Sequence, residues 1–276
     1  AGNISPAALS ALMDALDADA LPQIWVLELS SFQLETTETL NPFAATVLNV
    51  SDDHLDRYTD LDEYASAKAR IFQSADGAPG VQVINRADPR VRRMALADRR
   101  IISFGLDAPA GDKDFGLRLQ RGEPWLVQGG RFLLPVSELP LAGLHNAANA
   151  MAALALCTSL GIEADALLPA LRSFRGLPHR VEKIAELDGV IWYDDSKGTN
   201  VGATVAALNG LSRKAVLILG GEGKGQNFAP LVPAIRAHAK VVLLIGRDAA
   251  LIEKAIAPGD VPLERIESMG KAVVRA

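Results

Sequence analysis

Residues 24–58 read IWVLELSSFQLETTETLNPFAATVLNVSDDHLDRY, and this stretch decides the fold class. It holds two β-rich apolar runs, IWVLEL at 24–29 and ATVLNV at 45–50. The first run contains Glu28 near its end, and the second leads into a polar cluster that contains His54. Ligands collect beyond the carboxyl ends of strands in open α/β sheets. We therefore expect two buried strands and a site where they end.

Short apolar runs continue to alternate with helical stretches beyond this segment, which predicts a parallel sheet with covering helices. Asp60 or Asp62 can cap the first of these helices. After the parallel strands, period-two alternation with turn glycines predicts an antiparallel meander. The expected elements are a helix at 62–73, strands at 81–86 and 100–105, the meander over 114–141, and helices at about 145–160 and 164–174.

A hinge is expected at 175–180, where RGLPHR places Gly and Pro directly after a helix. Beyond it, a second doubly wound unit is predicted by further apolar runs that end in polar or glycine-rich loops. We therefore predict an α/β fold. A central, mostly parallel sheet domain with covering helices and an antiparallel meander spans 1–177, and an incomplete Rossmann-like domain spans 178–276. The second domain is expected to hold strands at 190–195, 214–221 and 240–248, and helices within 204–211, 231–239 and 271–276.

The composition fits an ordinary folded protein, because 49% of the 276 residues are apolar and the net charge is only −5. There is no dense Lys/Arg stripe, so nucleic acid is not expected as a partner. No run reaches the ~18 apolar residues of a membrane span, and the N-terminus lacks the pattern of a signal peptide. The one cysteine, Cys157, lies in an apolar run, so we expect a buried structural thiol and a cytoplasmic protein.

Glu28 and His54 are candidate ligands for a divalent ion, although Mg²⁺ prefers oxygen ligands and usually keeps waters. The acidic residues around His54 leave a capping or salt-bridged loop as an alternative interpretation. Lys68 lies on the helix that follows, and by itself it would be interpreted as a solvated helix residue.

The segment DDSKGTN (194–200) follows a predicted strand and could bind a nucleotide. Asp195 could accept hydrogen bonds from ribose hydroxyls, and Lys197 could neutralise a phosphate or a carboxylate. The alternative interpretation is a strand-to-helix turn with an ordinary cap, in which Thr199 or Asn200 starts the helix.

Two further segments carry groups suited to an anion or a base. The glycine loop GGEGKG (220–225) could hold an anion through backbone amides and Lys224, although it is not a P-loop and a bare turn explains it equally well. Asn146 and Asn149 lie three residues apart on one helix and could both reach a base edge. Arg180 could stack on a ring. Helix capping and a hinge salt bridge are the alternatives for these side chains.

Nine motifs in this order resemble the Mur ligase family of ATP-dependent amino-acid-adding enzymes. ELSSFQLE and DDSKGTN are most similar to the branch that adds D-glutamate. The resemblance implies ATP-dependent addition of D-glutamate to UDP-N-acetylmuramoyl-L-alanine through an acyl phosphate, with ATP and Mg²⁺. It also implies a monomeric, cytoplasmic enzyme of peptidoglycan synthesis, and so of cell shape and division. The motifs are GNI (2–4), ELSSFQLE (28–35), NVSDDHLDRY (49–58), AKARIF (67–72), LHNAANA (144–150), GLPHR (176–180), DDSKGTN (194–200), GGEGKG (220–225) and IGRD (245–248).

The resemblance also implies roles for single residues. It implies that Glu28 holds Mg²⁺ beside the nucleotide phosphates, and that His54 and Lys68 serve a second Mg²⁺. Lys68 is implied to be carbamylated by CO₂, which turns a cation into an oxygen-donor anion. With Lys197, these residues form the implied catalytic set. The implied ATP contacts are Asn146, Asn149, His179, Arg180, Asp195 and Lys197. The implied substrate contacts are Asn3, Ser30, Ser31 and Gln33 for the UDP-muramoyl part, and Thr199 and Lys224 for the D-glutamate carboxylates.

The family pattern places a P-loop and a UDP-binding domain before Ala1, and a loop of the D-glutamate pocket after Ala276. We therefore expect this chain to be the core of a ligase, incomplete at both ends and inactive by itself. Two alternatives stay open. The chain could be another amide ligase of the superfamily, of the L-alanine-adding or polyglutamate-adding type. It could also be a non-catalytic nucleotide- or UDP-sugar-binding remnant, although a remnant would not need a second-metal lysine such as Lys68.

Overall fold

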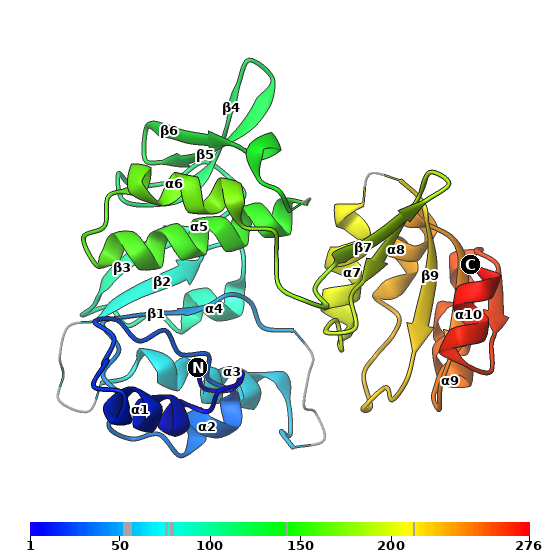
Figure 1. Ribbon diagram of the computed structural model, residues 1–276, viewed down its shortest axis with the longest axis horizontal. Coiled ribbons are helices and arrows are strands. Elements are labelled where there is room, and N and C mark those ends of the chain that lie inside the picture. Colours follow the sequence, from blue (N-terminus) through cyan, green and yellow to red (C-terminus); the bar gives the residue numbers. More distant parts are fainter. Residues whose placement is uncertain (52–56, 75–76, 78–79, 142, 212) are drawn as a thin grey trace.

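A computed structural model describes residues 1–276 except 52–56, 75–76, 78–79, 142 and 212 (Figure 1). The predicted site residue His54 lies outside the described residues. The described part of the chain forms a six-stranded sheet, followed by a two-stranded and a three-stranded sheet toward the C-terminus. This architecture confirms the predicted α/β class. None of the helices in the described part is both long and apolar enough to cross a membrane.

The strands of the large sheet are β1 (Ala44–Val47), β2 (Val81–Asn85), β3 (Arg100–Phe104), β4 (Phe115–Gln120), β5 (Glu123–Gln128) and β6 (Arg131–Pro135). They pair in sequence order. The first four run parallel and the last three antiparallel, which confirms the predicted meander. Arg121 and Gly122 connect β4 to β5 with φ angles of 52° and 82°. Such a two-residue turn matches the twist of the flanking strands.

The helices of this part are α1 (Ala8–Asp17), α2 (Ser31–Glu35), α3 (Leu61–Ala69), α4 (Pro89–Arg93), α5 (Leu144–Ser159) and α6 (Ala164–Ser173). α5 and α6 lie side by side on one face of the sheet, where they bury Phe104, Phe115 and Met151 (Figure 1). On the other face, α3 and α4 cover Val47 and Ile84. Because both faces are covered, consecutive residues of β2 are buried, from Val81 to Ile84.

Cys157 on α5 is less buried than predicted. It is partly exposed, because it lies at the edge of the helix face that packs on the sheet. Burial still raises the pKa of its thiol. The side chain is therefore a packing residue with little thiolate character.

Asp88 joins two elements of the sheet. Its Oδ1 accepts hydrogen bonds from the backbone N–H groups of Arg90 (2.8 Å) and Val91 (3.1 Å) at the start of α4, and its Oδ2 accepts one from Val50 (2.8 Å) after β1. We expect Asp88→Ala to lower the free energy of unfolding by about 1–2 kcal/mol, as the loss of a helix cap does. Urea unfolding measures this, with the exposed Asp98→Ala as control. Equal midpoints for the two variants would contradict the prediction.

The predicted strand at 24–29 does not form. Glu28 makes an isolated parallel bridge with Gly2, in which the backbone N–H of Asn3 donates to the Glu28 carbonyl (2.7 Å). Trp25 and Val26 are exposed rather than buried. A strand requires consecutive ladder hydrogen bonds along its length. Here the partner backbone bends away directly after the bridge, so the apolar run stays irregular.

The elements of the C-terminal part are β7 (Glu182–Leu187), β8 (Val190–Asp194), α7 (Val201–Gly210), β9 (Ala215–Gly220), α8 (Leu231–His238), β10 (Ala239–Ile245), α9 (Ala249–Ile256), β11 (Leu263–Arg265) and α10 (Met269–Arg275). β9, β10 and β11 form a parallel sheet in the order β11-β10-β9. Ile235, Val242 and Leu244 are fully buried in its core. This unit has the α/β alternation that was predicted, with the expected helices α7, α8 and α10.

The strand predicted at 190–195 forms as β8, but it does not join the parallel sheet. It pairs antiparallel with β7 in a separate hairpin. Asp188 and Gly189 connect the two strands with φ angles of 51° and 75°. An Asp-Gly pair between two short strands is a strong hairpin signal. The sequence therefore contained the information for this hairpin, and our prediction of a doubly wound start was wrong.

Candidate functional site

A cavity of about 200 Å³ lies where β1, β2 and β3 end and α5 begins. Leu48 and Asn49 follow β1, Asn85 ends β2, and Gly105 and Leu106 follow β3. The carboxyl ends of parallel strands are where open α/β sheets bind ligands. The lining combines apolar side chains with amides, as small-molecule sites do. The other lining residues are Ala87, Phe104, His145, Ala148 and Asn149.

The amide side chains of this cavity differ in what they do. Asn85 Nδ2 donates to the Leu48 carbonyl (2.7 Å), and its Oδ1 accepts from the Ala87 N–H (2.9 Å), so Asn85 joins the ends of β1 and β2. Asn149 is exposed at the cavity, where its amide can both donate to and accept from a base edge. Of the two asparagines predicted to reach one ligand, Asn149 lines this cavity and Asn146 does not. Neither Asn85 nor His145 was predicted from the sequence.

The hinge segment after α6 is held by the loop that follows β8. The Lys197 N–H donates to the His179 carbonyl (3.1 Å), and the Val181 N–H donates to Asp195 Oδ1 (3.1 Å). His179 and Val181 have positive φ angles of 64° and 48°. Such angles are strained for residues with a Cβ, above all for a β-branched one. The hydrogen bonds hold this strained turn and bring four predicted ATP contacts, Arg180 included, into one neighbourhood.

Three groups at this turn are close enough to share a metal ion: His179, Glu182 and Asp194 each offer a ligand atom, and these atoms lie within 4.8 Å of one another. The ring atom His179 Nδ1 is 2.6 Å from Asp194 Oδ2, and the backbone N–H of His179 donates to Glu182 Oε2 (2.9 Å). The hydrogen bonds pair these atoms without an ion, so the group fixes the position of His179. The bond from His179 is the main reason why the pKa of Asp194 is lowered to about 2.

We expect His179→Ala to raise the pKa of Asp194 from about 2 toward its ordinary 3.8, because the strongest interaction with the carboxylate is lost. A carboxyl whose pKa is lower in the folded than in the unfolded state stabilises the fold at pH values above its unfolded-state pKa. This contribution is lost as the pH falls through its folded-state pKa. The wild type should therefore lose stability from this group between pH 3.8 and about 2, and the variant should lose less, because the hydrogen bonds from Ser196 still act on the carboxylate. A carboxyl ¹³C NMR titration of Asp194 checks this, with His238→Ala as control. An unchanged pKa in His179→Ala would refute the prediction.

Asp195 combines partial burial with nearby charge. Burial raises the pKa of its carboxyl, while the hydrogen bond from Val181 and the charge of Arg180 act in the opposite direction. His145 on α5 also acts on Asp195, and burial lowers the pKa of His145. Gly198 lies against the carboxylate, since a Cβ there would come within 2.7 Å of Oδ2. Asp195, the predicted ribose contact, is thus held closely by its own loop, and it is near enough to His145 on α5 for the two groups to interact electrostatically.

The glycine loop and the DDSKGTN segment are joined by Gln226. Its buried side chain accepts from the Val201 N–H (2.9 Å) and donates to the Thr199 carbonyl (3.3 Å). Asp248, which follows β10, holds the same loop, because its Oδ2 accepts a hydrogen bond from a backbone N–H of the glycine loop (2.7 Å). These bonds place the segments of Thr199 and Lys224, the two predicted D-glutamate contacts, next to each other. The sequence prediction missed Gln226, whose only signal was a polar side chain directly after a glycine loop.

The predicted substrate contacts near the N-terminus form two groups. Asn3 Nδ2 donates to Glu28 Oε1 (3.0 Å), so a predicted substrate contact meets a predicted metal ligand. Ser30 and Gln33 form a capping box at the start of α2: Ser30 Oγ accepts from the Gln33 N–H (3.2 Å), and Gln33 Oε1 accepts from the Ser30 N–H (2.9 Å). Ser31 is buried. These three residues therefore have structural duties at α2 in addition to any contact with substrate.

Lys68 is partly buried on α3, and its Nζ lies 4.7 Å from the centre of the Tyr64 ring. This cation–π arrangement suits a positively charged lysine. Tyr64 packs on Tyr58, with ring centroids 5.2 Å apart, and the Tyr58 hydroxyl donates to Glu35 (2.5 Å). An ammonium group has no lone pair for a metal. The oxygen donor Glu28 thus fits Mg²⁺ as it stands, whereas Lys68 fits only after a change of charge such as carbamylation.

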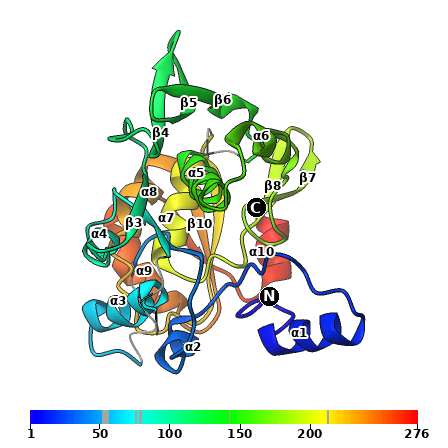
Figure 2. The same ribbon diagram turned by 90° about the vertical axis from the view of Figure 1, so that its left-hand side faces the viewer.

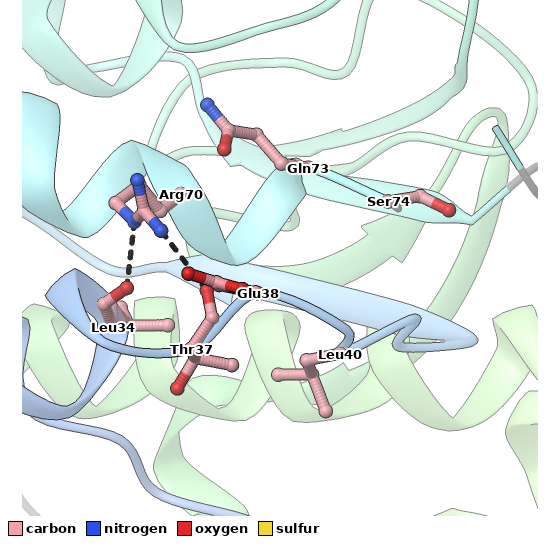
Figure 3. Close-up of a pocket in the computed structure, with 7 residues that line it drawn as sticks. All are labelled: Leu34, Thr37, Glu38, Leu40, Arg70, Gln73 and Ser74. Atoms are coloured by element: carbon pink, nitrogen blue, oxygen red, sulfur yellow. Dashed lines mark hydrogen bonds between the residues drawn. The ribbon is translucent and has the colours of Figure 1, made fainter. Parts of the chain in front are cut away.

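A second hollow, of about 100 Å³, lies between α2 and the turn that follows α3 (Figure 3). Arg70 reaches across it: Nε donates to the Leu34 carbonyl (2.7 Å) and Nη2 to the Thr37 carbonyl (3.0 Å). These carbonyls lie at the end of α2, where helix acceptors lack intrahelical partners. The guanidinium therefore holds α2 against α3, and we assign this hollow a structural role. Its other lining residues are Glu38, Leu40, Gln73 and Ser74.

Two family models match the chain. Residues 5–157 match the Mur ligase middle domain, and residues 179–276 match the Mur ligase, glutamate ligase domain. The chain belongs to the Mur ligase family. This confirms the resemblance carried by the motifs. In this Mur ligase, the cavity at the ends of β1 to β3 lies within the first match, and the loops joined by Gln226 lie within the second.

Curated relatives of this Mur ligase share more than half of its residues. It is 59% identical over 279 residues to UDP-N-acetylmuramoylalanine–D-glutamate ligase of Aromatoleum aromaticum. It is 57% and 55% identical over 273 residues to proteins of that name from Nitrosospira multiformis and Nitrosomonas europaea. The three alignments cover 99–100% of this chain and 57–59% of the relatives. The chain thus spans less than two thirds of the length of these relatives.

Solved structures share the fold of this Mur ligase. Mycobacterium tuberculosis folylpolyglutamate synthase, complexed with ADP and AMPPCP, has a TM-score of 0.69 at 21% identity. The alignment covers 97% of this chain and 64% of the synthase chain. UDP-N-acetylmuramate–alanine ligase of Thermotoga maritima has a TM-score of 0.62 at 19% identity. That alignment covers 88% of this chain and 55% of the ligase chain. At these identities the likeness shows the shared fold.

Proposed function

We propose that this protein is an ATP-dependent ligase that joins D-glutamate to UDP-N-acetylmuramoyl-L-alanine in the synthesis of peptidoglycan precursors. The observation that carries the proposal is the 55–59% identity, over 99–100% of the chain, to ligases named for this reaction. We further propose that the enzyme is cytoplasmic and monomeric. Its division into domains is proposed at 1–177 and 178–276, with the hydrogen-bonded turn of His179 directly after the boundary.

The nucleotide is proposed to bind between the cavity and the hinge. Asn149 would pair with the adenine edge in the cavity, and Asp195 would accept hydrogen bonds from the ribose hydroxyls. Lys197 would neutralise phosphate charge, because its backbone is tied to the hinge and its side chain is exposed. The other proposed ATP contacts are Asn146, His179 and Arg180.

In the proposed reaction, ATP phosphorylates the substrate carboxylate, the amine of D-glutamate attacks the acyl phosphate, and phosphate leaves as the amide bond forms. Positioning and charge neutralisation are the main tasks of such a site. Thr199 and Lys224 would hold the D-glutamate carboxylates on segments that Gln226 keeps together. Asn3, Ser30, Ser31 and Gln33 would orient the UDP-muramoyl substrate. Mg²⁺ held by Glu28, and by His54 with carbamylated Lys68, would neutralise phosphoryl oxygens when bound.

A coupled phosphate-release assay tests this function on the protein at its natural length. The assay contains ATP, Mg²⁺ and UDP-N-acetylmuramoyl-L-alanine or UDP-N-acetylmuramate, with D-glutamate, L-alanine or L-glutamate in separate reactions. We expect phosphate release that depends on D-glutamate and on UDP-N-acetylmuramoyl-L-alanine. Release that depends on L-alanine or L-glutamate instead would indicate another amide ligase of the superfamily. Nucleotide binding without any amino-acid-dependent release would indicate a non-catalytic binding protein.

A further inference from the structure

The imidazole of His145 lies where two glycines from the two parts of the chain face each other. A Cβ built on Gly143 would come within 2.7 Å of His145 Cε1, and one built on Gly210 within 2.9 Å of the same atom. Gly143 precedes α5, and Gly210 is the last residue of α7. The start of α5 approaches the end of α7 here, and the two helices overlap in the view of Figure 2. We call this seat, formed by Gly143 and Gly210 around the ring of His145, the glycine slot.

The same ring belongs to the cavity of the N-terminal part. His145 lines it together with Asn149, one turn further along α5. It also acts electrostatically on Asp195, which lies in the C-terminal part and whose backbone carbonyl accepts the Gly198 N–H (2.8 Å). One partly buried side chain thus meets the cavity on one side and α7 on the other.

We propose that His145 is a positioning residue that couples occupancy of the cavity to the docking of α7 against α5. The ring has little space, because the glycine slot confines it where any larger residue would collide with it. A ligand base in the cavity restricts the ring further. A ring held in this position keeps its contact with Gly210, so α7 stays packed against α5. By linkage, docking of α7 must then favour ligand binding by the same factor. The choice of a nucleotide as ligand rests on the proposed function, whereas the contact between His145 and Gly210 does not.

Gly210→Ala isolates this contact. Gly210 is helical and has no positive φ angle, so alanine suits its backbone and even favours the helix. The added Cβ would displace the His145 ring from the slot. Gly143 is less suitable as a test, because its φ of 97° would strain any other residue. Gly270→Ala on α10 is the matched control, since a Cβ there meets no atom within 4 Å.

The experiment measures ADP binding by calorimetry and hydrogen exchange of the α7 amides, on the protein at its natural length. In the wild type and in Gly270→Ala, we expect ADP to slow exchange in α7, although the cavity lies in the other part of the chain. In Gly210→Ala and His145→Ala, we expect the dissociation constant to rise about fivefold, the low end of common coupling factors, and the protection of α7 to vanish. In the double variant, Gly210→Ala should add nothing to His145→Ala, because the contact is already lost.

Melting temperatures separate these effects from misfolding, and His145→Gln serves as a second variant that keeps a polar side chain if His145→Ala is unstable. The proposal is overturned if Gly210→Ala binds ADP like the wild type and keeps α7 protected, or if the effects of the two single variants simply add. It is also overturned if ADP does not bind the wild type. If ADP binds with the expected coupling but D-glutamate gives no phosphate release, the proposed reaction fails while the coupling stands.

Discussion

Lys68→Ala is expected to lower the rate of D-glutamate-dependent phosphate release at least about a hundredfold, the usual effect of removing one group that stabilises charge in the transition state. As the structure shows it, Lys68 is partly buried on α3 with its Nζ over the Tyr64 ring. Carbamylation would turn this cation into an oxygen-donor anion beside the proposed metal site. Alanine removes that anion and leaves space at the end of the side chain.

Short carboxylic acids such as acetate are therefore expected to restore part of the activity of Lys68→Ala, because they can supply an anion in the vacated space. The same phosphate-release assay measures both effects, with the exposed Lys254→Ala as control. Rescue is the readout that a purely structural lysine would not give. Full activity of Lys68→Ala would refute the carbamate proposal, and loss of activity without any rescue would favour a packing role against Tyr64.

Phe115→Ala is expected to lower the free energy of unfolding of the N-terminal part by about 3–5 kcal/mol, as truncation of a buried aromatic residue does. Phe115 is 0% exposed, it is the first residue of β4, and it pairs with Phe104 at the point where the parallel strands meet the meander. α5 covers it with Met151 and other buried side chains, so the cavity left behind cannot collapse easily.

Leu119→Ala is the matched control for Phe115→Ala, because it lies on the same strand but is 72% exposed. Its effect should stay within about 0.5 kcal/mol. Unfolding in urea is best followed through the indole NMR signal of Trp125, which packs on Phe132 within the meander, since the two parts of the chain need not unfold together. The transfer of one such side chain from water into a protein interior contributes at least about 1.5 kcal/mol. A smaller loss for Phe115→Ala would contradict the prediction.

Local patterns predicted most of the fold. The helical periodicity over 145–160 corresponds to α5, and the turn glycines of the meander appear at the ends of β4 and β5. Asp60 caps α3 by accepting from the Asp62 and Glu63 N–H groups (3.0 and 2.8 Å), as the sequence suggested. These features depend on residues close together in the chain, so a single sequence is enough to predict them.

The prediction failed where pairing partners decide the structure. The apolar run at 24–29 has the composition of a strand, yet it makes one isolated bridge, because only residues 1–3 pair with it before that backbone bends away. β8 has the expected position but takes β7 as its partner. The Asp188-Gly189 turn between them was a local signal that our prediction did not use, whereas the pairing of residues 24–29 depends on distant segments that no short window of sequence contains.

For the candidate site, the sequence by itself determined which residue types occur in which motifs, because the chemistry of a motif is local to a few residues. Only the tertiary structure decided which of them meet. It placed Asn149 with Asn85 and His145 in one cavity, joined Thr199 to the glycine loop through Gln226, and seated His145 between two glycines from different parts of the chain. These meetings join residues up to 65 positions apart, and they exist only because β1 to β3 end at one edge of a packed sheet and the hinge returns the chain to it.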